Sequence, residues 1–253
     1  MLNEDAFRRA LAAAGLDAPV RWDEVATSTN DVARELAAAG APAWTLVAAG
    51  HQTAGRGRAG RTWVDEPGRA VMLSVILRPA LEPARVGLLS LAAGAAMAGA
   101  ASEAAALDVR CKWPNDLLAD GVKVGGILAE ADLDGDAIRH VVVGVGVNLE
   151  APDGVADAAG IGAVDEERLV TAFVRELAST LEGDPAAILE AWRARADTLG
   201  RRVEATTVDG TVVRGLARDV DATGGLLVEV TDGDPVRIAF GDVRHLRPEG
   251  AGP

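Results

Sequence analysis

The pattern of hydrophobic and polar positions divides the chain into two regions. Up to about residue 200, segments with helical spacing alternate with short runs of apolar and β-branched residues. From Arg202 onward only short alternating runs remain, and turn signals separate them at Asp209-Gly210, Gly224-Gly225 and Asp232-Gly233. We therefore predict a larger domain of helices and strands over residues 1–200 and a small all-β domain over residues 201–253.

The elements of the larger region follow from its periodicity and flanking residues. Helices are predicted over residues 4–14, 30–40, 85–107, 166–182 and 184–199. Strands are predicted over residues 20–25, 44–49, 71–77, 109–113, 117–118, 122–128 and 140–147. The Asp120-Gly121 pair predicts a hairpin turn. The Thr27-Ser28-Thr29-Asn30 cluster predicts an N-cap for the second helix.

Composition limits the class of protein. The chain has 253 residues, of which 49% are hydrophobic and 25% charged, as in ordinary globular proteins. It has no run of about 18 apolar residues, and its N-terminus is acidic and amphipathic, so we expect a cytoplasmic protein that does not bind membranes. Cys111 is the single cysteine and the three histidines are scattered, so neither an internal disulfide nor a zinc site is expected.

The charge distribution predicts a small anionic ligand. A formal net charge of -13 argues against nucleic-acid binding, which requires a broad cationic face. Against this acidic background, Arg56, Arg58 and Arg61 fall close together and are separated mostly by glycine. The alternative is a solvated basic turn, which is the usual role of a charge run.

Lysine is rare in this chain and its two occurrences are close together. Of 25 basic residues only Lys112 and Lys123 are lysine, which leaves 25 minus 2, or 23, arginines. One isolated lysine would be explained by coding bias. Two lysines so close together point to positions that need a compact ammonium group rather than a planar guanidinium.

The stretch Gly55-Arg-Gly57-Arg-Ala-Gly60 matches the G-x-G-x-x-G dinucleotide pattern. That use requires the glycines to open a helix whose N-terminus faces a pyrophosphate. Here Arg61-Thr-Trp-Val follows, and then Glu66-Pro67-Gly68, so no useful helix is predicted. We interpret the stretch as a mobile loop whose arginines cover a phosphate or a carboxylate.

Three further segments have both a structural and a functional interpretation. Lys112-Trp-Pro-Asn115-Asp116 with Lys123-Val-Gly-Gly126 is either a strand end, a turn and a bulge, or a site for phosphates and a magnesium ion. In Val143-Gly-Val-Gly-Val-Asn148, glycines inside a strand indicate that something approaches closely. Asn148 then either contacts a base or ribose, or ends the strand. Ser28-Thr29-Asn30 either caps a helix or offers polar groups to a ligand.

Together and in this order, these segments resemble the biotin-protein ligase family. The resemblance is carried by Ser28-Thr29-Asn30, Gln52 with GRGRAGRTW, KWPNDLL, KVGGILAE and GVGVNL. It extends from about residue 20 to the C-terminus. It implies an α+β catalytic domain of the class II synthetase-like type, with a mixed sheet and flanking helices, followed by a small SH3-like β-barrel.

The resemblance also implies a reaction in two steps. Biotin and MgATP give biotinyl-5'-AMP and pyrophosphate. The ε-amine of a lysine then attacks the adenylate, and this lysine belongs to a biotin carboxyl carrier domain of an acyl-CoA or pyruvate carboxylase. Such chemistry needs charge stabilisation and alignment rather than a covalent nucleophile, which agrees with the absence of a Ser-His-Asp pattern.

The resemblance assigns the site residues position by position. The expected biotin-binding residues are Ser28, Thr29, Asn30, Gln52, Arg56, Gly57, Arg58, Lys123 and Gly126. The expected ATP-binding residues are Arg58, Arg61, Trp63, Lys112, Asn115 and Asn148. Lys123, Arg56 and Arg58 are expected to be catalytic, and Asp116 to contact the magnesium ion.

Some members of the family carry an N-terminal DNA-binding domain and act as repressors. Only about 20 residues precede the first predicted strand, so we expect the monofunctional type, which does not bind DNA. The sequence leaves three alternatives open: a lipoate-protein ligase, a dinucleotide-dependent oxidoreductase and a non-catalytic biotin-binding module.

Overall fold

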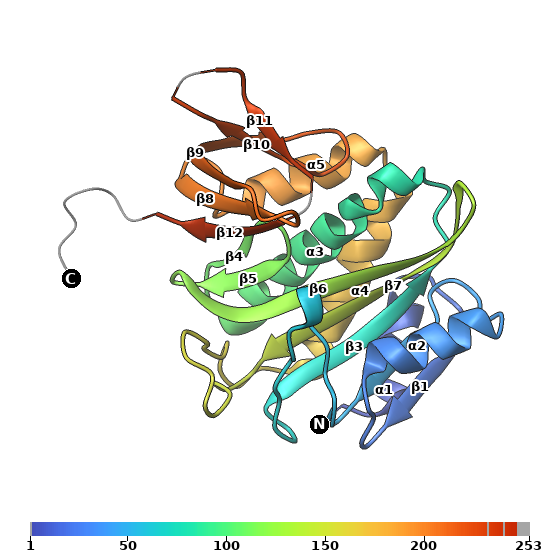
Figure 1. Cartoon of the computed structure of the whole chain (residues 1–253). Helices are drawn as coiled ribbons and strands as arrows, with labels where there is room; N and C mark the ends of the chain where they lie inside the picture. Colours follow the sequence, from blue (N-terminus) through green and yellow to red (C-terminus); the bar gives the residue numbers. More distant parts are fainter. Residues whose placement is uncertain (1, 232, 240, 247–253) are drawn as a thin grey trace.

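The computed structural model describes residues 2–231, 233–239 and 241–246, so the last residues of the predicted C-terminal domain, 247–253, lie outside the described residues. A seven-stranded sheet with helices forms the larger part, and a five-stranded antiparallel sheet forms the C-terminal part (Figure 1). This arrangement confirms the predicted α+β fold with a small β-domain at its end.

The helices are close to their predicted ranges. They are α1 (Glu4–Ala13), α2 (Thr29–Ala38), α3 (Gly87–Ala105), α4 (Glu166–Glu182) and α5 (Pro185–Arg195), with short 3-10 turns η1 (Arg58–Gly60) and η2 (Pro83–Arg85). The prediction was wrong at the end of the last helix, which stops at Arg195 rather than at residue 199. The backbone is extended at Ala196, whose amide closes the final turn on Arg193.

The strands of the large sheet are β1 (Val20–Asp23), β2 (Leu46–Ala49), β3 (Ala70–Leu77), β4 (Val109–Lys112), β5 (Asp116–Ala119), β6 (Val122–Asp134) and β7 (Ala137–Asn148). Those of the small sheet are β8 (Arg202–Thr207), β9 (Val212–Val220), β10 (Leu226–Glu229), β11 (Val236–Ile238) and β12 (Gly241–His245). The second strand starts later than predicted because Trp44 has a φ of 66°, which interrupts extended structure. The strands β6 and β7 are longer than predicted and form one long hairpin.

The large sheet has the order β1-β2-β3-β7-β6-β5-β4. The pair β1 and β2 is parallel and the remaining pairs are antiparallel, so the sheet is mixed, as predicted. Successive residues of a strand face opposite sides, so Val75 and Ile76 contribute to different cores. The helix α2 covers one face, and α1, α3, α4 and α5 contribute to the core on the other (Figure 1).

The helix α3 is the buried centre of the larger core. Its residues are mainly alanine, leucine and glycine on all sides, and it packs against α4 and α5 as well as the sheet. The segment Pro83–Ala105 is long and apolar enough to span a membrane, but 67% of its most apolar stretch is buried inside this fold. A helix that is apolar all round is expected at such a position.

The turn between β5 and β6 determines which side chains of β6 meet. Asp120 and Gly121 both have positive φ, 50° and 78°, which confirms the predicted hairpin. The register shifts beside Leu117, which pairs with Gly125, whereas Leu118 pairs with Lys123. This bulge inserts one residue into β6. It therefore allows Lys123 and Gly126, three positions apart, to face the same side.

Trp113 connects the two parts of the protein. Its side chain is 1% exposed, and its Nε1 donates to the carbonyl oxygen of Gly224, 2.9 Å away, in the turn before β10. Its backbone amide donates to Oγ1 of Thr198 over 2.8 Å. The small sheet is thereby held against the KWPND segment, close to the predicted nucleotide side of the site.

Candidate active site

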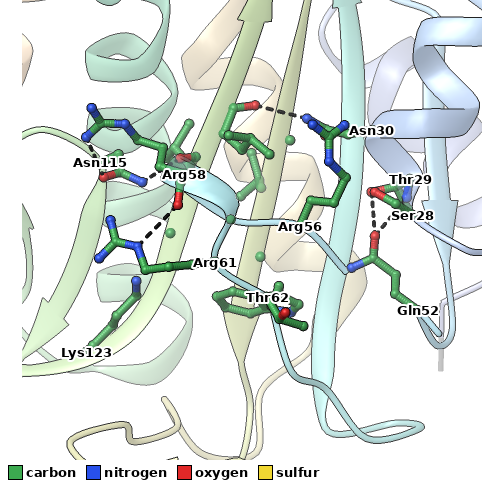
Figure 2. Close-up of a pocket in the computed structure, with 18 residues that line it drawn as sticks. Ser28, Thr29, Asn30, Gln52, Arg56, Arg58, Arg61, Thr62, Asn115 and Lys123 are labelled. Carbon is green, nitrogen blue, oxygen red and sulfur yellow. Dashed lines mark hydrogen bonds between the residues drawn. The ribbon is translucent and has the colours of Figure 1, made fainter. Parts of the chain in front are cut away.

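The predicted site residues converge on one cavity although they lie far apart in the sequence. The cavity opens where the N-terminus of α2, the arginine-containing loop and the strands β6 and β7 meet (Figure 2). The predicted residues that line it are Ser28, Thr29, Asn30, Gln52, Arg56, Gly57, Arg58, Arg61, Trp63, Asn115, Lys123 and Gly126.

Three predicted residues do not line this cavity. Asn148 is buried at the end of β7, and its Nδ2 donates to the carbonyl oxygen of Ala159 over 3.1 Å, which matches the strand-end alternative. Asp116 lies behind Lys123, with 2.6 Å between Oδ1 and Nζ. The Nζ of Lys112 is 4.0 Å from Oδ2 of the same carboxylate. The two lysines therefore share one acidic partner.

The loop from Gly55 to Trp63, here called the basic loop, is a small closed turn. The amide of Gly57 donates to the carbonyl oxygen of Arg61 over 2.7 Å, and the amide of Trp63 donates to that of Gly55 over 2.9 Å. A Cβ on Gly55 would lie 2.6 Å from the carbonyl oxygen of Trp63, so this position needs glycine. Only the three-residue η1 follows the first glycines, so the dinucleotide-binding interpretation is wrong.

The arginines of the basic loop have different partners. Arg56 forms ion pairs with Asp31 and Glu130, and Arg61 forms one with Asp242 in β12. Arg58 instead donates to the carbonyl oxygen of Gly241 and to Oδ1 of Asn115, over 3.2 and 3.4 Å.

Arg58 is the best placed of these arginines to bind an anion. Within the described ranges it makes no ion pair, and burial lowers the pKa of its guanidinium from the ordinary value. A partly buried guanidinium without an acidic partner gains from a bound anion, because the anion offsets the cost of desolvation.

The start of α2 provides polar groups to the cavity. Ser28 occupies the predicted N-cap position, but its side chain makes no capping hydrogen bond, so that part of the N-cap prediction was wrong. The first amide of the helix, that of Thr29, donates instead to Oε1 of Gln52 over 2.7 Å. Ser28 is only 1% exposed, and it lines the cavity without a capping role.

The glycines of β7 are needed because two site residues lie against the strand. A Cβ on Gly144 would be 2.0 Å from Oδ1 of Asn30, and one on Gly146 would be 2.7 Å from Cζ2 of Trp63. The prediction of a close approach was correct. The approaching groups are protein side chains, and they form the floor of the cavity.

Some residues of the site were not predicted. Asp31, Ser74 and Glu130 bind the predicted polar residues, and the further cavity-lining residues are Thr62, Ile127, Leu128, Gly144, Val145 and Gly146. Glu130 ends the KVGGILAE motif and Asp31 follows Ser28-Thr29-Asn30, so adjacency to the motifs was the available signal. The chain has 38 acidic residues, and adjacency alone does not show which of them pair with Arg56.

Comparisons with known proteins agree with the fold and the motifs. Residues 22–148 match the biotin/lipoate A/B protein ligase family, and residues 198–246 match the biotin protein ligase C-terminal domain. The biotin--[acetyl-CoA-carboxylase] ligase of Mycobacterium tuberculosis is 39% identical over 236 residues, which is 87% of this chain and 86% of that protein.

Solved structures show the same fold. A biotin protein ligase from Aquifex aeolicus in complex with biotin and ATP has a TM-score of 0.74 at 24% identity, and the match covers 90% of this chain and 99% of that one. A biotin protein ligase from Leishmania major in complex with biotinyl-5-AMP has a TM-score of 0.59 at 26% identity, with 91% and 99% covered. These matches confirm the resemblance found in the sequence: the chain belongs to the biotin protein ligase family.

Proposed function

We propose that this protein activates biotin with ATP to biotinyl-5'-AMP and transfers the biotinyl group to one lysine of a biotin carboxyl carrier domain. The observation that carries the proposal is the cavity that holds Arg58 and Lys123 opposite the polar start of α2. The cavity has a polar end and a cationic end. A small carboxylic acid that reacts with ATP matches this arrangement, because its polar ring would lie at the polar end and its carboxylate would meet a phosphate at the cationic end.

The polar end of the cavity is the proposed binding site for the ureido ring of biotin. Ser28, Thr29 and Gln52 present hydroxyl and amide groups that match the hydrogen-bonding ureido group of biotin. Gly126 lines the wall beside Lys123, and its missing side chain leaves room for the acid. On the other side, Arg61, Trp63 and Asn115 form the proposed nucleotide end.

The chemistry needs aligned charges. In the first step a carboxylate oxygen of biotin attacks the α-phosphorus of ATP, the bond to the bridging oxygen breaks, and pyrophosphate leaves with the electron pair. Lys123 and Arg58 stabilise the negative charge that gathers between the two anions. In the second step a neutral lysine amine attacks the acyl carbon and loses a proton, and AMP leaves.

The basic loop has a second proposed task. An acyl-adenylate hydrolyses readily, so a loop that closes over it protects it from water until the acceptor lysine arrives. Gly57 and Gly60 provide a flexible backbone for that motion.

Asp116 is a poor candidate for a magnesium ligand. Its oxygens lie 2.6 Å from Nζ of Lys123 and 4.0 Å from Nζ of Lys112, so two cations already neutralise this carboxylate. A divalent cation prefers several free oxygen ligands, and among the described residues no cluster of three or more acidic, histidine or cysteine side chains is arranged to hold a metal ion. In the proposed reaction, magnesium therefore enters with the substrate as MgATP.

The decisive experiment first measures the incorporation of labelled pyrophosphate into ATP in the presence of biotin. Mass spectrometry then measures the biotinylation of a purified carrier domain. We expect exchange that depends on biotin and a mass increase of one biotinyl group on one lysine. Exchange with lipoate alone would support the lipoate ligase alternative. Biotin binding without exchange would support a non-catalytic module. The proposed location of this reaction is the cytoplasm.

A further inference from the structure

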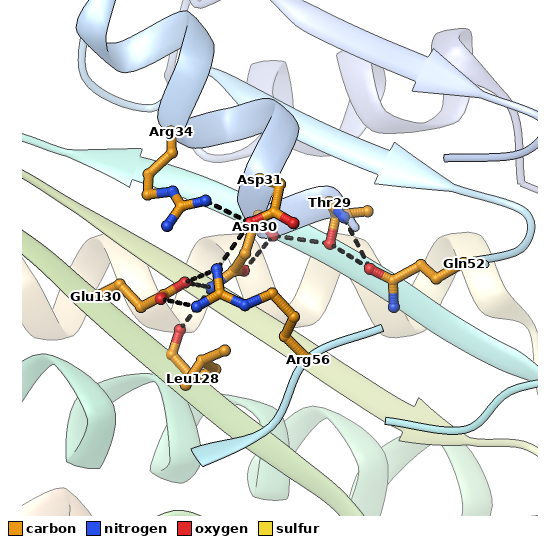
Figure 3. A network of polar contacts seen from close by, with 9 residues as sticks. Thr29, Asn30, Asp31, Arg34, Gln52, Arg56, Leu128 and Glu130 are labelled. Carbon is orange, nitrogen blue, oxygen red and sulfur yellow. Dashed lines mark hydrogen bonds and ion pairs between the residues drawn. The ribbon is translucent and has the colours of Figure 1, made fainter. Parts of the chain in front are cut away.

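Two acidic residues that do not line the cavity hold Arg56 in place (Figure 3). Nη1 of Arg56 donates to Oδ1 of Asp31 over 2.7 Å and to Oε2 of Glu130 over 3.2 Å. Its Nη2 donates to Oε1 of Glu130 over 2.6 Å. The two carboxylates come from α2 and β6, so Arg56 ties the first turn of the basic loop to both elements.

Glu130 has a second partner in the predicted biotin subsite. Its Oε2 accepts a hydrogen bond from Nδ2 of Asn30 over 2.8 Å. Oδ1 of Asn30 in turn accepts one from the hydroxyl of Ser74 over 2.7 Å. The Asn30 amide thus donates through Nδ2 to Glu130 and accepts through Oδ1 from Ser74, and a flipped amide would lose both hydrogen bonds. Glu130 therefore fixes the orientation of the Asn30 amide as well as that of Arg56.

The chain of contacts continues to the polar end of the cavity. The Ser74 hydroxyl also lies 2.8 Å from Oγ1 of Thr29, and Thr29 is bound through its amide to Oε1 of Gln52. A continuous hydrogen-bonded path therefore joins the basic loop to the residues proposed to hold the biotin ring. Glu130 is the link between the loop and this path.

The charges separate Arg56 from Arg58. Burial by itself would lower the pKa of Arg56, but the ion pairs with Asp31 and Glu130 raise it above its ordinary value. The guanidinium is firmly cationic and two carboxylates already neutralise it. Arg58 lacks such acidic partners in the described part of the chain, so Arg56 is suited to anchoring the loop and Arg58 to binding the reacting anions.

We propose that Glu130 is a positioning residue of biotin activation: by holding Arg56 and Asn30 together it fixes the basic loop against the biotin subsite. The inference rests on the proposed function and adds a residue to it. Glu130 acts through its two partners rather than through contact with substrate, because it does not line the cavity.

The test is Glu130→Gln, which keeps the size of the side chain but replaces one acceptor oxygen by an NH2 group. That NH2 group would face the N–H donors of Arg56 and Asn30. We expect the KM for biotin to rise about tenfold, as for the loss of one charged hydrogen bond, with the KM for ATP changed less than about twofold. Release of the preformed adenylate should accelerate by a similar factor. The matched control is Asp132→Asn, two residues along the same strand, where the carboxylate pairs with Arg139 over 3.8 Å and is 47% exposed.

A double-mutant cycle with Arg56→Ala separates positioning from general loss of structure. If Glu130 acts partly through Arg56, the combined variant should raise the biotin KM by less than the product of the two single effects, because the contact with Arg56 is already lost and only the contact with Asn30 remains to be removed. The inference would be overturned if the two substitutions raised the biotin KM by the full product of their single effects, or if Glu130→Gln kept the wild-type biotin KM and adenylate retention. It would also be overturned if Asp132→Asn raised the biotin KM as much as Glu130→Gln does.

Two further measurements keep the outcomes distinct. Wild-type enzyme that shows no biotin-dependent exchange would reject the proposed function itself, whatever Glu130 does. If Glu130→Gln melts well below the wild type, Asp31→Asn repeats the test from the other side of Arg56, because it leaves the Asn30 contact in place. A raised biotin KM is then expected again, and an unchanged one would count against anchoring of Arg56.

Discussion

Nη2 of Arg61 lies 2.8 Å from Oδ1 of Asp242, so the basic loop is paired with β12 of the small sheet. Both side chains are more than half exposed. An exposed ion pair contributes about 0.2–1 kcal/mol. The pair therefore adds little to stability, and it matters because the carboxylate occupies a guanidinium that is proposed to bind ATP phosphates.

Removing either partner should affect ATP and leave biotin almost unchanged. Arg61→Ala is expected to raise the KM for ATP about tenfold, whereas Asp242→Asn should lower it by about two- to fivefold, because a carboxylate that competes with the triphosphate is gone. The check is initial-rate kinetics of pyrophosphate exchange with each substrate varied. Glu229→Gln, which removes an exposed partner of Arg218 in the same small sheet, is the control. A raised ATP KM in Asp242→Asn would show that the carboxylate positions Arg61 and does not compete.

The two lysines should differ in importance. Lys123 lines the cavity and Lys112 does not, so Lys123→Arg is expected to reduce adenylation by at least about a hundredfold and Lys112→Arg by less than about tenfold. A guanidinium is planar and wider than an ammonium group. It therefore does not fit in the space between the biotin carboxylate, the α-phosphate of ATP and Asp116. Single-turnover formation of the adenylate measures both variants. Equal losses would remove the special role given to Lys123.

Substitution of two glycines should separate binding from folding. A Cβ on Gly126 would meet nothing closer than 3.6 Å, so Gly126→Ala should fold normally but raise the biotin KM about tenfold, since its methyl group enters the cavity. A Cβ on Gly144 would lie 2.0 Å from Oδ1 of Asn30. Gly144→Ala should therefore lower stability by about 1–3 kcal/mol. Thermal melting and biotin kinetics on both variants test this contrast.

His245 should make stability depend on pH. Its pKa in the folded protein is held below the ordinary 6.5, first by burial and then by the nearby charge of Lys112. The folded state thus favours the neutral ring, so the stability is fully present above the ordinary pKa and is lost as the pH falls from that value through the lower pKa of the folded protein. Melting temperature should decline between about pH 7.5 and 5.5 more steeply in the wild type than in His245→Gln. Parallel curves would contradict this assignment.

Cys111 should be unreactive in the folded protein. It is 2% exposed, and desolvation raises the pKa of its thiol to about 12. At about pH 8 only about one thiol in ten thousand is then ionised. Iodoacetamide should leave the native protein unmodified by mass spectrometry and add one carbamidomethyl group after denaturation. Modification of the native protein at the rate of a free thiol would show that Cys111 is accessible.

The sequence by itself determined most of the helices and strands and most of the polar residues that meet in the cavity. Periodicity located the helices and strands because a buried face repeats with the period of its own element. The motif order identified the family, and the glycines of β7 announced a close approach because a strand tolerates glycine only at a cost.

Only the tertiary structure decided how these residues divide the work. Arg56 and Arg58 look alike in the sequence, but Asp31 and Glu130 neutralise Arg56, whereas no acidic side chain among the described residues forms an ion pair with Arg58. Asn148 belongs to the predicted set, yet its amide is occupied by Ala159. Charge partners come from strands and helices distant in the chain, so their identity depends on register and packing. That dependence is the reason why Glu130 and Asp242 could not be distinguished from the many other acidic residues until the fold was known.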